Sequence, residues 1–154
     1  MTLHFAYGSN MSCAQMGARC PGAFALGTAT LLHWRFIIGP QGHGSIVPQP
    51  GGVVHGVLWR LGARDMAAIN AYEAVDTGLY IRRIVPVRYA AVLRPALVYI
   101  LRRPGEGTPR PAYIGLVVAA ARDWGLPERY IHALQRWSPL GWRGTRAKDT
   151  GEIR

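Results

Sequence analysis

The sequence has few cysteines and no hydrophobic segment long enough to cross a bilayer. Cys13 and Cys20 are its only cysteines, and their spacing matches neither a C-x-x-C redox pair nor a zinc-binding pattern. We therefore predict free thiols, as is usual in a reducing compartment. No apolar run approaches the roughly 18 residues of a membrane-spanning helix, and the N-terminus lacks the basic start of a secretory signal. These absences predict a cytoplasmic protein without a membrane partner.

Common catalytic and metal-binding patterns are missing as well. The five histidines do not show the H-x-x-x-H spacing that places two metal ligands on one face of a helix. The serines lack the G-x-S-x-G pattern of a nucleophile elbow. The loop from Gly39 to Gly44 lacks the Lys-Ser/Thr pair of a phosphate-binding loop. We expect neither a metal nor a cofactor.

Acidic residues are also scarce: there are 8, against 18 basic ones, and the net charge is +10. Such a balance raises the question of nucleic-acid binding. However, the basic residues, nearly all arginines, are spread along the chain and form no run of five or six. The densest basic stretch, residues 143–154, also contains Asp149 and Glu152. We therefore do not expect a nucleic-acid partner, and we interpret residues 141–154 as a polar, basic C-terminal tail.

The residue pattern predicts one α+β domain over residues 1–140. Segments rich in β-branched and aromatic residues predict strands over residues 4–7, 24–38, 46–47, 53–61, 80–89 and 96–101. Amphipathic segments with start and stop signals predict helices over residues 12–19, 62–75, 111–124 and 127–137. Because strands and helices do not alternate regularly, a doubly wound parallel sheet is not favoured. We predict a small, mixed, largely antiparallel sheet that curls into a barrel.

Glu73 is the first candidate for chemistry. In the helix predicted over residues 62–75, the spacing of Met66, Ile69 and Glu73 places them on one face. Since Met66 and Ile69 are apolar, this face should point inward, where a carboxylate is costly unless it is paired or functional. Burial would raise its pKa toward neutrality, as suits a general base. A structural ion pair with Arg82 or Arg83 explains the same pattern.

A second candidate is the tetrapeptide Tyr7-Gly8-Ser9-Asn10. It follows a predicted strand and precedes a helix for which Ser12 is the expected N-cap. Such a turn exposes backbone N–H groups that can bind a carboxylate or an oxyanion, and Gly8 permits close approach of a ligand. A plain turn is the alternative interpretation.

Taken together, these segments resemble the γ-glutamylcyclotransferase-like family. The similar segments, in chain order, are Phe5-Ala6-Tyr7-Gly8-Ser9-Asn10-Met11, residues 54–61, residues 69–75, Gly78-Leu79-Tyr80-Ile81-Arg82, Pro111-Ala112-Tyr113 and residues 125–130. The resemblance covers residues 4–138. It implies a small β-barrel with flanking helices. There are two departures: Ala74 stands where the family usually has Gly, and Asn70 where it usually has Asp. The loop also reads Y-G-S-N rather than Y-G-S-L, so the glutathione-specific branch matches less well.

The resemblance also implies an activity and a set of site residues. The family opens a γ-glutamyl amide by attack of the substrate's own α-amine, which releases 5-oxoproline and an amino acid or amine without a cofactor. Its catalytic glutamate corresponds to Glu73, and its substrate-binding residues to Tyr7, Gly8, Ser9, Asn10, Tyr80 and Tyr113. The alternative is a basic binding protein, possibly for nucleic acid, on a catalytically inactive scaffold of this family. The sequence leaves the oligomeric state open, including a homodimer.

Overall fold

A computed structural model describes residues 1–138 of the chain, and the predicted basic tail lies outside this part. Its strands are β1 (Thr2–Ala6), β2 (Phe24–Ile38), β3 (Gly44–Leu61), β4 (Tyr80–Tyr89) and β5 (Val92–Leu101). Its α-helices are α1 (Cys13–Arg19), α2 (Ala63–Tyr72), α3 (Tyr113–Asp123) and α4 (Glu128–Gln135). Two 3₁₀ turns, η1 (Ser9–Met11) and η2 (Val75–Thr77), complete the set.

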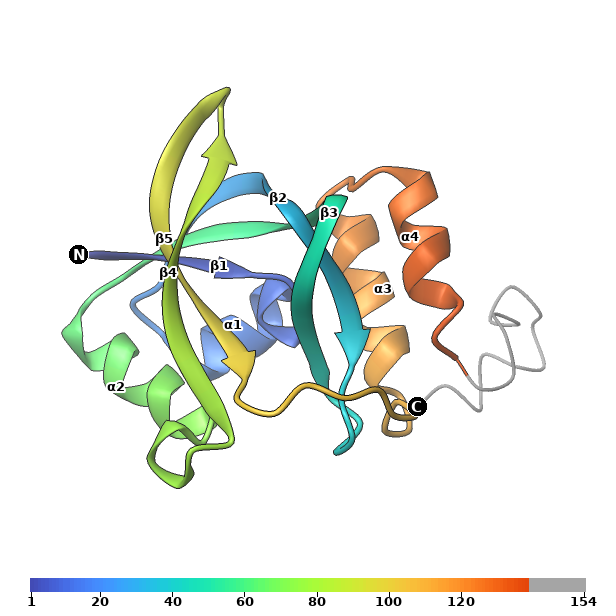
Figure 1. Ribbon diagram of the computed structural model, residues 1–154. Helices are drawn as coiled ribbons and strands as arrows, with labels where there is room; N and C mark the ends of the chain where they lie inside the picture. Colours follow the sequence, from blue (N-terminus) through green and yellow to red (C-terminus); the bar gives the residue numbers. More distant parts are fainter. Residues whose placement is uncertain (139–154) are drawn as a thin grey trace.

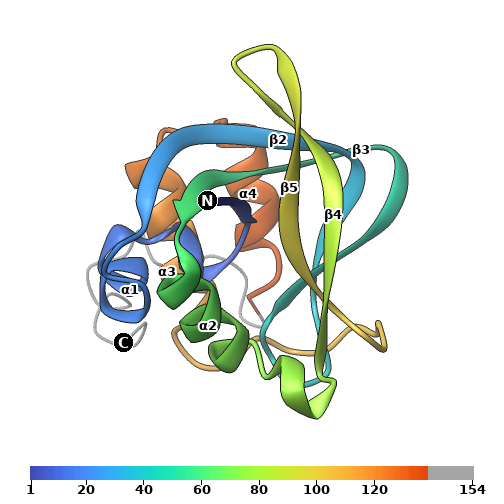
Figure 2. The same ribbon diagram turned by 90° about the vertical axis from the view of Figure 1, so that its left-hand side faces the viewer.

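The strands form a closed barrel in the order β1-β3-β2-β4-β5. All neighbouring strands pair antiparallel, except that β1 and β5 pair in parallel at His4 and Leu97. Helices α3 and α4 lie side by side against one side of the barrel, and α2 lies on the other (Figure 1). The β4–β5 hairpin extends beyond the barrel (Figure 2). The predicted α+β barrel is therefore confirmed.

Two long strands give the barrel its curvature. The β2–β3 hairpin changes register between Ala25 and Gly27 and again between Leu32 and Trp34. Extra residues at such bulges bend and twist a strand, so two strands of 15 and 18 residues can wrap around one core. Gly27 and His33 have positive φ values of 143° and 70°, which marks them as the positions where the strand bends.

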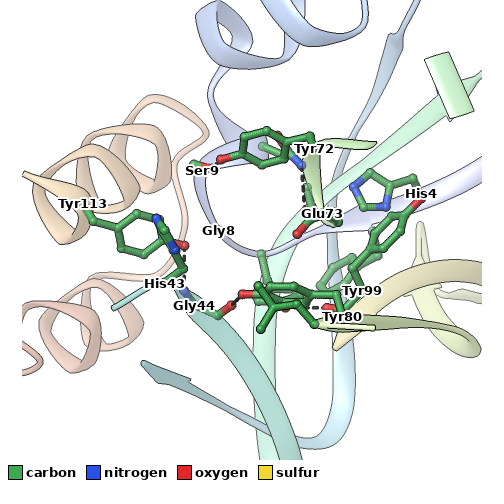
Figure 3. A pocket seen from close by; sticks show the side chains of 15 residues that line it. His4, Gly8, Ser9, His43, Gly44, Tyr72, Glu73, Tyr80, Tyr99 and Tyr113 are labelled. Carbon is green, nitrogen blue, oxygen red and sulfur yellow. Dashed lines mark hydrogen bonds between the residues drawn. The ribbon is translucent and has the colours of Figure 1, made fainter. Parts of the chain in front are cut away.

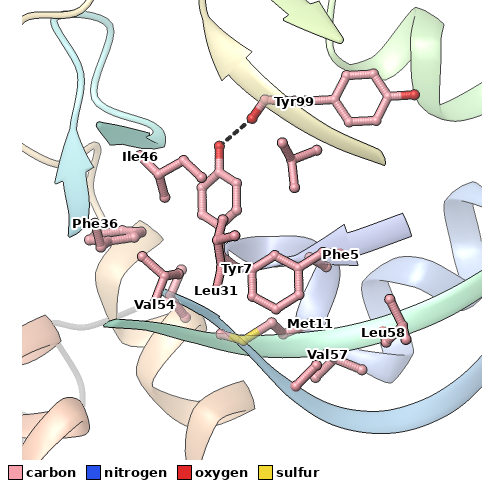
Figure 4. Packing of buried hydrophobic residues seen from close by; sticks show 14 of the residues in the cluster. Phe5, Tyr7, Met11, Leu31, Phe36, Ile46, Val54, Val57, Leu58 and Tyr99 are labelled. Atoms are coloured by element: carbon pink, nitrogen blue, oxygen red, sulfur yellow. Dashed lines mark hydrogen bonds between the residues drawn. The ribbon is translucent and has the colours of Figure 1, made fainter. Parts of the chain in front are cut away.

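Large apolar side chains fill the barrel interior (Figure 4). Fully or almost fully buried members include Phe5, Met11, Leu31, Ile46, Val54, Val57, Leu58 and Tyr99. Because Phe5 on β1 and Tyr7 directly after β1 belong to this core, the segment that follows β1 is attached to the well-packed interior of the barrel. Cys13 is exposed and Cys20 is buried, and both are free thiols, as predicted.

Several element boundaries differ from the sequence prediction. The separate strands predicted over residues 46–47 and 53–61 are one strand, β3, because β2 pairs with both of its halves. The helix predicted over residues 62–75 ends at Tyr72, since Ala74 has left-handed backbone angles, φ 52° and ψ 43°. Strand β5 starts at Val92 rather than residue 96, after a tight turn through Ala90 and Ala91, which lacks the usual Asn-Gly signal.

Candidate active site

A cavity of about 240 Å³ opens where the end of β1 meets the end of α2. Its walls come from β1, η1, the start of β3, the end of α2, β4, β5 and the start of α3. The side chains that line it include His4, Tyr7, Ser9, Asn10, His43, Tyr72, Glu73, Tyr80, Tyr99 and Tyr113. Figure 3 shows Glu73 in the middle, with Tyr113 and His43 on one side of it and Tyr99 and His4 on the other.

The loop that follows β1 is anchored at both ends. On the strand side, the buried Tyr7 hydroxyl donates to the Tyr99 carbonyl at 2.6 Å, across the barrel (Figure 4). On the helix side, the Trp124 indole N–H donates to the Met11 carbonyl at 2.7 Å. Ser12 then caps α1 as predicted, because its hydroxyl accepts the Gln15 N–H at 3.2 Å. The loop therefore presents Gly8, Ser9 and Asn10 to the cavity from a fixed backbone.

Tyr113 lies between two glycines. Its hydroxyl accepts the Gly44 N–H at 3.0 Å. A Cβ atom on Gly8 would stand 2.7 Å from this hydroxyl, and one on Gly44 would stand 2.8 Å from it, so side chains at either position would displace the tyrosine. The glycine of the Tyr-Gly-Ser-Asn loop is therefore needed for close packing against Tyr113. The ring of His43 packs edge-on against the Tyr113 ring at 5.3 Å.

Glu73 caps the C-terminal end of α2, and its N–H donates to the Ile69 carbonyl at 2.9 Å. The side chain is partly buried, and its Oε1 accepts the Asn10 side-chain N–H at a long 3.4 Å. Burial raises the pKa of Glu73 to about 7, against an opposing effect of the Arg19 charge. Within residues 1–138, no Lys, Arg or His forms a salt bridge with this carboxylate. The ion pair with Arg82 or Arg83 is therefore not formed.

Arg19 connects the loop to the end of α2. Its guanidinium donates to the side chains of Asn10 and Ser9, the latter at 3.1 Å, and lies 3.6 Å from the centre of the Tyr72 ring. The Tyr72 hydroxyl is in turn 3.4 Å from the Ser9 hydroxyl. A positive charge is thus held beside Glu73 without direct contact, which moderates the rise of its pKa.

The remaining tyrosines of the cavity have their hydroxyls engaged by the protein. Tyr80 donates to the Gly44 carbonyl at 2.8 Å, and Tyr99 donates to the side-chain oxygen of Asn70 at 2.6 Å. Burial is the main cause that raises the pKa of each of these two phenols well above its ordinary value. They are neutral at physiological pH and shape the cavity without adding charge. Asn70, one of the departures from the family pattern, still supplies the oxygen that Tyr99 needs.

All of the site residues predicted from the sequence line this one cavity: Glu73, Tyr7, Gly8, Ser9, Asn10, Tyr80 and Tyr113. The sequence interpretation missed His4, His43, Gly44, Tyr72 and Tyr99. Tyr72 precedes Glu73 directly, and this adjacency is the one signal that could have indicated it. His4 and Tyr99 lie near the site because the closed barrel pairs β1 with β5. His43 and Gly44 lie there because the start of β3 contacts Tyr113.

The chain is similar to known proteins in sequence and in fold. The model of the AIG2-like family matches residues 53–134, more than half of the chain. The γ-glutamylcyclotransferases of Mus musculus and Homo sapiens are each 26% identical to this chain, over 98% of it and 86% of their own length. A solved γ-glutamyl cyclotransferase structure, 24% identical, superposes with a TM-score of 0.84 over 99% of this chain and 96% of its own, which shows the shared fold. No helix within the described residues is long and apolar enough to span a membrane.

Proposed function

This chain belongs to the AIG2-like family, and we propose that it is a γ-glutamylcyclotransferase with Glu73 as its general acid and base. The substrate is a γ-glutamyl amide, and the products are 5-oxoproline and an amino acid or amine. The observation that carries the proposal is the position of a partly buried, unpaired carboxylate in a cavity, opposite the Tyr7–Asn10 loop. The full-length similarity to γ-glutamylcyclotransferases of two mammals supports it.

The proposed reaction moves two protons from the attacking nitrogen to the leaving nitrogen. Glu73, as a carboxylate, takes a proton from the substrate's α-ammonium group. The freed amine attacks the γ-carbonyl carbon of the same molecule and closes a five-membered ring. The attacking nitrogen, now in the ring, still carries two protons and gives one of them up as it becomes the lactam N–H. The bond from this carbon to the leaving nitrogen breaks while Glu73 returns the first proton to that nitrogen, and the second proton makes the released amine an ammonium ion. A pKa of about 7 suits both steps, because a group that must accept and donate works best near the operating pH.

The cavity contributes by holding the substrate in a folded conformation. Bringing the α-amine within reach of the γ-carbonyl is a proximity effect that lowers the entropic part of the barrier. The volume of about 240 Å³ lies below the roughly 300–1,000 Å³ of sites for drug-sized ligands, and therefore favours a small metabolite. The Ser9 and Asn10 N–H groups come first in the η1 turn and have no partner within it, but the Ser9 backbone interacts with the Tyr113 hydroxyl. We assign the Asn10 N–H to the substrate's α-carboxylate or to the developing oxyanion.

The alternative of a basic binding protein on an inactive scaffold has less support. Such a protein has no need for an unpaired carboxylate in a cavity, because ionising it there destabilises the fold. Moreover, no arginine within residues 1–138 lines this cavity.

A screen of γ-glutamyl compounds with 5-oxoproline as the readout tests the proposal. We expect turnover of at least one γ-glutamyl amine or γ-glutamyl amino acid by the wild-type protein and a large loss in Glu73→Gln. Production of 5-oxoproline at equal rates by both proteins would contradict the role of Glu73. Complete absence of 5-oxoproline over a broad panel would contradict the activity itself.

A further inference from the structure

The imidazole of His4 has a free acceptor nitrogen next to the cavity. His4 lies on β1, is only 3% exposed and lines the cavity wall. Its Nδ1 is 3.1 Å from the Leu97 carbonyl. Since a carbonyl only accepts hydrogen bonds, Nδ1 carries the proton. Burial lowers the pKa of His4 to about 4, so the ring is neutral at physiological pH and Nε2 offers a lone pair.

This nitrogen has no hydrogen-bond partner among residues 1–138. Leaving a buried acceptor unpaired destabilises a protein, and such a group in a native structure therefore calls for an explanation. Its neighbour Tyr99 packs edge-on against the ring at 5.5 Å but gives its hydroxyl proton to Asn70. Within residues 1–138 no donor is left for His4 Nε2, so a molecule in the cavity that His4 lines is the candidate donor.

Two acceptors of the cavity, Glu73 and His4 Nε2, lack a strong partner within the described residues. The hydroxyl protons of Tyr7, Tyr80 and Tyr99 are used within the protein. Glu73 accepts only the long bond from Asn10, and His4 Nε2 accepts none. Two acceptors in one small cavity favour a ligand group with several N–H bonds, such as an amine.

We propose that His4 Nε2 accepts a hydrogen bond from the α-amino group of the substrate, so that His4 and Glu73 hold this group together. The inference rests on the proposed function and deepens it. In Figure 3, Glu73 lies between His4 and Tyr113, with His4 on the side of Glu73 that faces away from Tyr113. After the α-ammonium gives one proton to Glu73, the neutral amine keeps two N–H bonds and one lone pair. A hydrogen bond to His4 fixes one N–H and limits the amine to orientations in which its lone pair reaches the γ-carbonyl carbon.

Two substitutions separate this role from a structural one. His4→Asn keeps a side-chain N–H close to the position of Nδ1, where it can donate to Leu97, and removes the Nε2 acceptor. His4→Gln places an amide oxygen close to the position of Nε2 and loses the short-range donor. If His4 binds the amine, Asn should raise KM for a γ-glutamyl amide by about 10- to 100-fold, as expected for loss of a hydrogen bond to a charged group. The KM of His4→Gln should stay closer to that of the wild type, even if the melting temperature of this variant is lower.

If His4 has only a structural role, the activity of the two variants should follow their melting temperatures. His4→Asn would then be more active than His4→Gln, and this result would overturn the proposal. An unchanged KM in both variants would also overturn the proposal. His132→Gln serves as the control for the chemical change, since His132 lies exposed on α4 and does not line the cavity. This control should behave like the wild type in all measurements.

A second measurement does not depend on turnover. Long-range ¹H–¹⁵N spectra of the histidine side chains, with His4 identified from the His4→Asn spectrum, should show Nδ1 protonated and Nε2 unprotonated. Adding a γ-glutamyl amide should shift the Nε2 resonance, whereas the glutaryl amide that lacks the α-amino group should not. Equal shifts with both compounds, or none, would refute the assignment. If the wild type releases no 5-oxoproline, the activity is wrong, and the same titration with glutamate and glutarate still decides whether His4 binds an amino group.

Discussion

Glu73→Gln is the substitution with the most clearly defined consequences for stability. The pKa of Glu73 rises from 4.5 to about 7 in the folded protein, and each unit corresponds to 1.36 kcal/mol. For a fully buried group this would be roughly 3 kcal/mol, and partial exposure reduces it to about 1–3 kcal/mol. Because the folded-state pKa is the higher one, this cost is absent below pH 4.5, grows as the pH rises through 7 and is complete above it.

The Gln variant should therefore be about 1–3 kcal/mol more stable than the wild type at pH 8.5 and equally stable at pH 4.5. Its activity should change in the opposite direction. Loss of a general acid and base lowers turnover by about 10²- to 10⁴-fold, with a small effect on substrate affinity. In the wild type, kcat/KM should rise with pH around 7, where Glu73 becomes a carboxylate.

Urea unfolding at the two pH values and 5-oxoproline release per folded molecule measure both effects. Glu128→Gln is a matched control, because Glu128 is an exposed carboxylate on α4 and should change neither quantity. A Gln variant of Glu73 that is less stable at pH 8.5 and loses activity only with its folded fraction would refute the reasoning, since this is the behaviour of a broken structural pair.

Three further substitutions test other parts of the site. Arg19→Met removes the charge that lowers the pKa of Glu73, so the midpoint of the pH–kcat/KM profile should move above about 7, whereas Arg19→Lys should leave it nearly unchanged. Ala74→Gly relieves the left-handed backbone at φ 52° and should raise the melting temperature by about 2–4 °C, the strain outweighing the entropic cost of glycine; a lower melting temperature would contradict this. Gly8→Ala brings a Cβ to 2.7 Å from the Tyr113 hydroxyl and should lower the melting temperature, and adding Tyr113→Phe should recover part of the loss. Purely additive effects would show that the two positions do not clash.

Local chemistry was sufficient to predict most elements of the fold. Strands β2 and β4 begin and end where β-branched and aromatic residues predict them. Helix α1 starts after its Ser12 cap, and the Gly125–Pro127 stop and start separates α3 from α4. These signals act within a few residues, so the sequence contains them directly. The continuity of β3 through residues 48–52 depends on the pairing of β2 with Pro48 and Val53 on either side. The residues 48–52 themselves have the local composition of a Pro/Gly loop.

The part of the site that depends on barrel closure could not be predicted. His4 and Tyr99 are far apart in the sequence and meet because β1 pairs with β5 in parallel. Gly44 and Tyr113 meet across a similar separation, through a single hydrogen bond. Neither pair has a fixed spacing or a recognisable motif, since the contacts follow from strand order. Local patterns therefore predict the loop and Glu73, and the family resemblance adds Tyr80 and Tyr113. The sequence does not indicate His4, Tyr99 or Gly44.

Glu73 was found by an argument that the structure corrects in part. The helical spacing with Ile69 placed it on an inward face, yet the helix ends at Tyr72 and Glu73 is its C-terminal cap. The left-handed Ala74 turns the chain at this point, so that η2 and β4 follow. A carboxylate inside the helix would lie over the barrel wall with Ile69, which is fully buried. At the cap, the same side chain faces a cavity that is open to a ligand. The family usually has Gly at the position of Ala74, and glycine adopts left-handed backbone angles most easily. A left-handed residue directly after the glutamate ends the helix there, so that the glutamate lies at the helix end beside the cavity.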